Sequence, residues 1–414
     1  MRTPLTIIVV LLALLVPLAF ATHDEGGGAA AEEPAGTPVA TVARRVEELR
    51  GLRFARVPEP VRVSAKEARE EGIADLDRSY PDWRRTADEA LYTRLGLLPP
   101  GTDLRKVQSS VFGEQVAGYY DPRTDRLSIV EDAGGTAVVD EVTLAHELVH
   151  ALEDQRAGID LPRVDATDDT GLAYRALVEG TASAVMFEYL RRHFPPDVAL
   201  GGLLGGVFAG TDTTGLPPFV VHTLVFPYVR GQAFVEELYR RAGGRWGLVD
   251  HALRDRPPAS TEQVLHPDAY LRVEMPEAVR LPDVGGALGA GWTRLTSGAL
   301  GEWQTAQLLS HHGQPSREPA AGWGGDRYAV WRRQANLPCL APCVERDVIA
   351  IRWRWDTRAV AGSGASTRVV SRPAVATSAC GSAATAARSA GSNSAASARV
   401  SQRQRIASAC GHEA

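Results

Sequence analysis

Five consecutive residues, His146-Glu147-Leu148-Val149-His150, have the types and spacing of a metal site that can hydrolyse a bond. On a helix the two histidines lie one turn apart on the same face, where two imidazole nitrogens can bind one Zn²⁺ at about 2.0–2.1 Å. Glu147 lies roughly 100° further round the helix, where its carboxylate can take a proton from a metal-activated water. The surrounding residues are apolar, which argues against a chance match on a polar surface helix. The pattern therefore predicts a zinc site with Glu147 as general base.

Zinc in a hydrolase usually takes three protein ligands, so a third must come from elsewhere in the chain. Asp154 is too far away, because eight residues on a helix separate it from the first histidine by about 12 Å. It either orients the second histidine or is simply solvated. Glu179 is the better candidate, because it lies in an apolar helical stretch, 170–190, where an unpaired carboxylate is costly. The alternative is a pair with Arg175, and the neighbouring Gly180 predicts that another backbone passes close.

These residues carry a resemblance to a known group of enzymes. The two histidines, followed by a helix with Glu179-Gly180-Thr181-Ala182, resemble the gluzincin metallopeptidases, the thermolysin-like clan. Segments 118–122 and 257–267 are similar to a group of exported bacterial proteins of that type. The resemblance covers roughly residues 100–275 and implies zinc bound by His146, His150 and Glu179, with Glu147 as general base.

Two features depart from the gluzincin pattern. The 28 residues between His150 and Glu179 exceed the thermolysin-like spacing, which predicts an inserted loop. Ser183 stands where those enzymes commonly have an acidic residue that supports the metal ligands.

A peptidase site also needs a substrate-binding strand and a transition-state donor. The β-like run 126–130 is the candidate for a strand edge beside the zinc. His266 is the candidate donor to the oxyanion, with Tyr270, Tyr119 and Tyr120 as alternatives. Each of these side chains also has an ordinary structural role as a competing explanation.

Local patterns predict the elements that position these residues. Residues 39–50 repeat apolar positions at helical spacing, and Ser64 with Glu67 has the pattern of a helix cap. Runs 116–120 and 126–130 predict a hairpin, and Asp140 is the expected N-cap of the histidine-bearing helix. Residues 219–239 predict two helical stretches around Pro227 and Gly231.

Bulk properties indicate an ordinary globular protein that leaves the cytoplasm. The 414 residues carry a net charge of −5 without a concentrated basic segment, which argues against nucleic acid as the main partner. Arg2 precedes an apolar run, 5–20, and Ala19-Phe20-Ala21 has the small-x-small pattern of a cleavage site. We expect a signal peptide at 1–21 and a flexible leader at 22–38. An uncleaved signal acting as a membrane anchor is the alternative.

The C-terminal part differs in composition from the rest. Residues 276–358 predict a small α/β module, and the Ala- and Ser-rich segment 359–414 predicts disorder. The abrupt change after Thr357 suggests, as a hypothesis, a shifted reading frame. Of the four cysteines, Cys339 and Cys343 fit a small disulfide loop or free thiols better than a zinc knuckle.

Together these observations predict an α+β fold with a gluzincin-like catalytic core in residues 39–275: a small antiparallel sheet, the two ligand-bearing helices and a helical second wall. The expected function is an exported zinc metallopeptidase that acts on peptides or proteins. Two other possibilities stay open. One is a zinc-binding protein of the cell envelope that holds a peptide or partner without cleaving it, and the other is a structural protein in which the motif is incidental.

Overall fold

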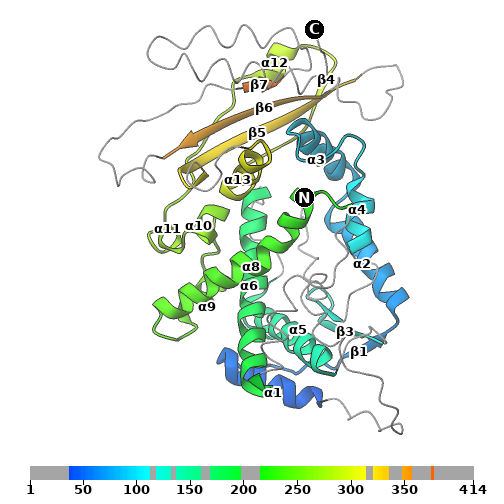
Figure 1. Cartoon of the computed structure of the whole chain (residues 1–414), viewed down its shortest axis with the longest axis vertical. Coiled ribbons are helices and arrows are strands. Elements are labelled where there is room, and N and C mark those ends of the chain that lie inside the picture. The colour runs from blue at the N-terminus through cyan, green and yellow to red at the C-terminus, as the bar shows by residue number, and fades with distance from the viewer. Residues whose placement is uncertain are drawn as a thin grey trace. The chain divides into compact units, whose positions relative to one another are not determined.

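The computed structural model describes residues 37–111, 118–131, 137–159, 168–196, 215–313, 320–334, 347–356 and 374–376. Backbone contacts divide the chain into two units, Met1–Ala376 and Thr377–Ala414, and the second lies outside the described residues. The first unit combines many helices with two small sheets (Figure 1). This confirms the α+β class.

The first sheet has three strands in the order β1 (Val61–Val63), β3 (Arg126–Val130) and β2 (Gly118–Asp121). β2 and β3 are antiparallel, which confirms the predicted hairpin, and β1 pairs in parallel with the other side of β3. The prediction that 126–130 offers a free edge to a substrate is therefore wrong, because β3 is the central strand. Its pairing with β1 is a non-local contact that the hairpin pattern does not contain.

Two predictions for the N-terminal helices are confirmed. Helix α1 (Val39–Arg50) spans the expected residues and buries Val42 and Val46. Helix α2 (Ala65–Ser79) begins with a capping box, in which Ser64 Oγ accepts from the Glu67 N–H at 3.2 Å and the Glu67 carboxylate accepts from the Ser64 N–H at 2.8 Å.

The two predicted ligand-bearing helices are longer than expected. Helix α5 (Ala137–Ala157) begins three residues before Asp140, so Asp140 lies in its first turn and is not its N-cap. An acidic side chain is favourable at both positions, so this signal does not fix where a helix starts. Helix α6 (Asp168–His193) extends the expected stretch 170–190 at both ends. Residues 151–157 and 168–178 are helical, so most of the separation between the ligands lengthens these two helices instead of forming an inserted loop.

Helix α8 (Pro218–Arg241) is one continuous helix with Pro227 inside it, where two stretches were expected. A proline in a helix interior costs about 3 kcal/mol. Phe219 and Val220 are buried before it, and Phe234 and Leu238 are buried after it. Each such burial contributes about 1.5–3 kcal/mol, so packing on both sides outweighs the local preference.

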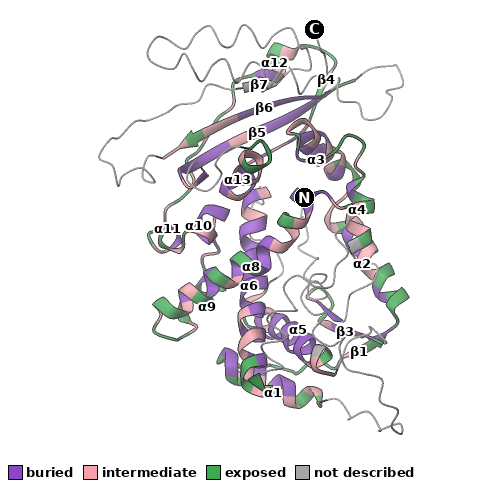
Figure 2. Cartoon of the chain, viewed as in Figure 1, coloured by how far each residue is buried: buried purple, intermediate pink, exposed green. Residues whose placement is uncertain are grey.

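The second sheet is antiparallel, with the order β4 (Trp292–Gly298), β5 (Trp323–Arg333), β6 (Asp347–Trp355) and β7 (Ala374–Ala376). Strand β7 lies inside the segment 359–414 that was predicted to be disordered, and the rest of that segment lies outside the described residues. One apolar cluster joins Leu91 of α3 (Asp82–Arg94) and Phe219 of α8 to Tyr328 and Ile349 of this sheet (Figure 2). Residues 39–275 and the module 276–358 thus share a core.

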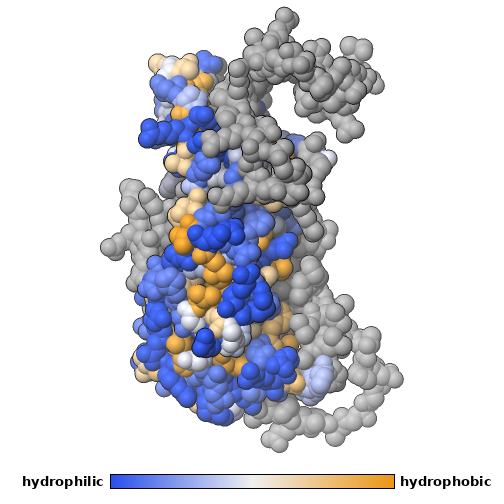
Figure 3. All heavy atoms as spheres, turned by 90° about the vertical axis from the view of Figure 1, so that its left-hand side faces the viewer, coloured by the Kyte–Doolittle hydropathy of each residue, from blue (hydrophilic) through white to orange (hydrophobic). Residues whose placement is uncertain are grey.

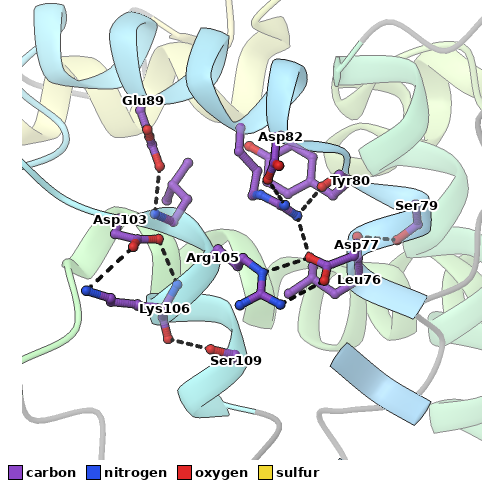
Figure 4. Close-up of polar contacts among 12 residues, drawn as sticks. Leu76, Asp77, Ser79, Tyr80, Asp82, Glu89, Asp103, Arg105, Lys106 and Ser109 are labelled. Atoms are coloured by element: carbon purple, nitrogen blue, oxygen red, sulfur yellow. Dashed lines mark hydrogen bonds and ion pairs between the residues drawn. The ribbon is translucent and has the colours of Figure 1, made fainter. Parts of the chain in front are cut away.

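Polar contacts connect helices α2, α3 and α4 (Leu104–Val111) (Figure 4). Arg105 donates to both oxygens of Asp77 at 2.9 and 2.8 Å, and Arg85 pairs with the same carboxylate at 3.2 Å. The Leu104 N–H donates to Glu89 at 2.9 Å. An exposed ion pair such as Arg105–Asp77 contributes at most about 1 kcal/mol, so it mainly helps to set how the helices meet.

The remaining described helices are α9 (Gly247–Arg254), α10 (Thr261–Leu265), α11 (Pro267–Leu271), α12 (Val284–Leu288) and α13 (Gly301–His311). The predicted signal peptide, all four cysteines and the Gly-rich stretch 198–209 lie outside the described residues. Among the helices that the structure describes, none combines the length and apolarity needed to cross a membrane.

Candidate metal centre

Helices α5 and α6 bring the three predicted ligands together. His146 and His150 are fully buried, and their Nε2 atoms lie 3.0 Å apart. Glu179 Oε2 lies 3.3 Å from Nε2 of His146 and 3.5 Å from Nε2 of His150. Ligands that bind a tetrahedral ion at about 2.0–2.1 Å stand about 3.3–3.4 Å from one another. The three atoms therefore fit a single zinc-sized ion.

Burial and mutual contacts shift the pKa values of all three groups. Burial by itself lowers the pKa of His150, but contacts with Glu179 and the charge of Glu147 outweigh it and raise the pKa, so an ion that binds there must displace its proton. Burial lowers the pKa of His146 to about 4, so its imidazole is neutral. Burial by itself raises the pKa of Glu179, but hydrogen bonds and charges from the two histidines outweigh it and lower the pKa overall. A neutral imidazole and an ionised carboxylate are the forms that bind metal.

Glu179 pairs with the histidines instead of the alternative partner. In the described part of the chain its carboxylate contacts the imidazoles of His146 and His150, and no ion pair joins it to Arg175. The structure thus supports the ligand interpretation of Glu179.

Gly180 allows α6 to meet α8 at this point. A Cβ on Gly180 would overlap the carbonyl of Gly231, and a Cβ on Gly231 would overlap the carbonyl of Ala176. The predicted close backbone is therefore confirmed as helix α8. This crossing fixes the position of α6, and with it that of Glu179, relative to α8.

Glu147 lies on the same helix beside the three ligands and is buried. Its Oε2 accepts a hydrogen bond of 2.9 Å from the Tyr120 N–H of strand β2. Burial raises the pKa of this carboxyl to about 8, although the charge of His150 and the Tyr120 N–H lower it. Strand β2 therefore orients the predicted general base.

Asp154 does neither of the two things expected of it. Its Oδ2 accepts from the Tyr120 hydroxyl at 2.9 Å, and its Oδ1 accepts from the Ile159 N–H at 3.1 Å. His150 Nδ1 has no hydrogen-bond partner among the described residues, so Asp154 does not orient it. Asp154 instead ties strand β2 to the end of α5.

The hydrogen bonds that usually orient the histidine ligands of a zinc site are missing among the described residues. In zinc sites the second histidine nitrogen usually donates to a carboxylate or carbonyl. Here Nδ1 of His146, Nδ1 of His150 and Oγ of Ser183 are all buried without a partner in the described residues. The ligands are held by helix packing, and this agrees with the expected lack of an acidic residue at Ser183.

His266, the predicted donor to the oxyanion, contacts helix α13 and none of the three candidate ligands. Its Nε2 lies 2.9 Å from Oε1 of Glu302 on α13, and its role in catalysis stays a prediction. The alternatives also have structural partners: Tyr270 donates to the Arg256 carbonyl, Tyr119 to Glu71 and Tyr120 to Asp154.

Sequence reasoning missed Tyr228, a buried residue of α8. Its ring stacks on His146, with ring centroids 6.4 Å apart and an interplanar angle of 23°. Tyr228 follows Pro227, where the sequence predicted a break in the helix. Because α8 continues through this proline, Tyr228 lies on the same helix as the residues that pack against α6. No signal in the sequence alone connects it with the histidines.

Comparison with known proteins is informative only for the C-terminal part. Residues 292–405 match a family described as a domain of unknown function (DUF8575). No curated protein and no solved structure matches the chain. The matched residues continue well past Thr357, so the change in composition lies inside a recognised domain, which argues against a shifted reading frame.

Proposed function

We propose that the protein is a zinc-dependent metallohydrolase with a gluzincin-like core, acting as a peptidase outside the cytoplasm. The observation that carries the proposal is the convergence of two histidine nitrogens and one carboxylate oxygen, with a buried glutamate beside them. Two histidines and one glutamate form a known ligand set of catalytic zinc. Export follows from the apolar N-terminal run.

The ligands His146, His150 and Glu179 would hold the zinc. When bound, zinc polarises a substrate carbonyl and lowers the pKa of a water. Glu147 accepts the proton of that water and later delivers it to the leaving amine. The Tyr120 N–H fixes one of its carboxylate oxygens, which leaves the other for the proton.

The outer edge of β2 is the proposed substrate-binding strand, in place of β3. The Tyr120 N–H points away from β3 and toward Glu147. In an antiparallel pair the backbone groups of alternate residues face the same way, so those of Gly118 also face outward. Because Glu147 already accepts from the Tyr120 N–H, an extended peptide at this edge would pair with the backbone of Gly118, beside the glutamate.

The first test is metal content with substitutions at the ligand and the base. We expect about one zinc per chain, lost in Glu179→Gln and kept in Glu188→Gln, a control on the same helix whose carboxylate pairs with Arg191. Cleavage of casein and of a mixed peptide library should fall about 10²–10⁴-fold in Glu147→Gln while zinc stays bound. Zinc that stays bound with no effect of Glu147→Gln on function would indicate a binding protein. No zinc in well-folded protein would rule out the metallohydrolase.

A further inference from the structure

Three of the four polar side chains in 260–263 serve the fold. Ser260 Oγ caps α10 by accepting from the Gln263 N–H at 3.3 Å. Thr261 Oγ1 donates to Asp169 at the start of α6. Gln263 donates to the Glu274 carbonyl at 2.6 Å. The fourth, Glu262, has a different environment.

Glu262 is a buried carboxylate that has no partner in the described part of the chain. It is 6% exposed, and its carboxylate has neither a hydrogen bond nor an ion pair among the described residues. Burial, followed by the charges of Glu302, Asp356 and Glu274, raises its pKa to about 8, and His266 opposes the shift. A buried charge is costly unless it is paired, so this carboxyl keeps its proton near neutral pH unless a cation enters to pair with it.

Glu262 faces a cavity of about 450 Å³, which we call the Glu262 pocket. Two glutamates of its wall already have arginine partners: Glu274 pairs with Arg272 at 3.3 Å and Glu277 with Arg354 at 2.8 Å. The cavity is lined by Glu262, Arg272, Glu274, Met275, Glu277, Gly324 and Asp356. Figure 3 looks onto the side that carries α9, α10 and α11, where hydrophilic residues surround a band of apolar ones.

The geometry favours an organic cation over a metal ion. Among the described residues, the only group of His, Cys, Asp and Glu close enough to hold a metal is the one around His146. The cavity has the volume of a ligand pocket, well above that of one ion. A planar guanidinium can bind a carboxylate through two hydrogen bonds, and Met275, which is 60% exposed, offers apolar surface to its stem.

We propose that the Glu262 pocket binds the guanidinium group of an arginine, with Glu262 as its carboxylate partner. The arginine can belong to a polypeptide or be the free amino acid. The inference is independent of the zinc chemistry, because none of the lining residues is a metal ligand.

Calorimetric titration of the zinc-loaded full chain at neutral pH tests the proposal. Nα-acetyl-argininamide should bind at one site with a dissociation constant on the order of 1 mM or tighter, as expected for a ligand of its size. The neutral isostere Nα-acetyl-citrullinamide should not bind, and Nα-acetyl-lysinamide should bind at least ~10-fold more weakly. Comparison with free L-arginine distinguishes the two sources, since a polypeptide site prefers the blocked form.

Glu262→Gln keeps the shape of the side chain and removes its charge. It should weaken argininamide binding at least ~10-fold with zinc content unchanged. Glu236→Gln, an exposed change on α8, should bind like the wild type.

Several results would overturn the proposal. One is binding of the citrulline or the lysine ligand with the same affinity as the arginine ligand. Another is binding of calcium chloride without binding of argininamide. A third is an unchanged affinity of Glu262→Gln for argininamide. The ligand comparison uses only the wild-type chain, so it decides the question even when the variant does not fold.

Discussion

At the scale of single residues, the side chains of the candidate metal centre are almost completely buried. His146, Glu147 and His150 are at most 1% exposed, and Glu179 is 3% exposed. Electrostatic interactions are stronger in such surroundings than in water, which favours both metal binding and proton transfer.

Tyr228 is the residue that we expect to assist the reaction from α8, because its stacking on His146 brings a phenol beside the metal centre. Tyr228→Phe should lower kcat about 10²–10³-fold, the usual effect of removing one donor to an oxyanion. Zinc content should not change. Tyr239→Phe, on the same helix and packed on Trp246, is the matched control and should keep full activity. A rise in KM with unchanged kcat would show that Tyr228 only shapes the site.

At the scale of elements, the centre depends on how closely two helices approach. Gly180→Ala and Gly231→Ala each place a methyl group on the backbone of the other helix. The overlap forces the two helices apart, and a shift of α6 moves Glu179, so we expect a loss of about 3 kcal/mol or more in the free energy of unfolding, together with weaker zinc binding. Gly247→Ala is the control, because nothing lies within 4 Å of its added Cβ. Urea unfolding of the three variants, with metal analysis, checks this; wild-type zinc in Gly180→Ala would contradict it.

Helix α1 is attached to α5, the helix of the two histidines, through the buried cation Arg50. Arg50 donates to Glu153 of α5 at 2.7 Å and to Asp250 of α9 at 2.6 Å, and its guanidinium lies over Trp246 at 4.6 Å. Arg50→Met leaves the buried Glu153 without its partner, which should cost about 3–5 kcal/mol.

The control for Arg50 is on the same helix. Arg44 pairs with Glu48 in an i,i+4 contact in which both side chains are more than half exposed. Arg44→Met should therefore change the free energy of unfolding by no more than about 0.5 kcal/mol. Equal effects of the two substitutions in chemical denaturation would refute the special role of Arg50.

At the scale of the whole molecule, buried carboxyls gather where α6, α10 and β5 meet α13. Burial raises the pKa of Asp169 to about 7, of Glu262 to about 8 and of Asp326 to about 6. Each group binds its proton more tightly in the folded state than in the unfolded chain. Stability is therefore greatest below the unfolded pKa and declines as pH rises toward the folded pKa.

Glu262→Gln isolates one part of this dependence. Its Tm should equal that of the wild type near pH ~4.5 and exceed it by a few degrees near pH ~8.5, because only the wild type loses a proton there. The substitution leaves the candidate metal centre unchanged, so any effect of pH on that centre cancels in the difference. Differential scanning calorimetry across this range checks the prediction, and a constant difference in Tm would contradict it.

The sequence by itself determined what depends on neighbours along the chain. The span of α1, the capping box at Ser64 and the β2–β3 hairpin follow from local patterns, and so does the pairing of His146 with His150 on one helix face. Glu179 was also found in the sequence, because a carboxylate within an apolar helix is costly wherever that helix lies. These features depend on spacing and side-chain chemistry alone.

Tertiary structure decided the rest, because those features depend on contacts between distant segments. The parallel pairing of β1 made β3 central, and packing on both sides carried α8 through Pro227. The crossing of α6 and α8 at Gly180 and Gly231 set the position of Glu179. Helix α8 also brought Tyr228 to His146. The need of Glu262 for a partner also emerged only here, since its neighbours Ser260, Thr261 and Gln263 are as polar in sequence but find their partners in the fold.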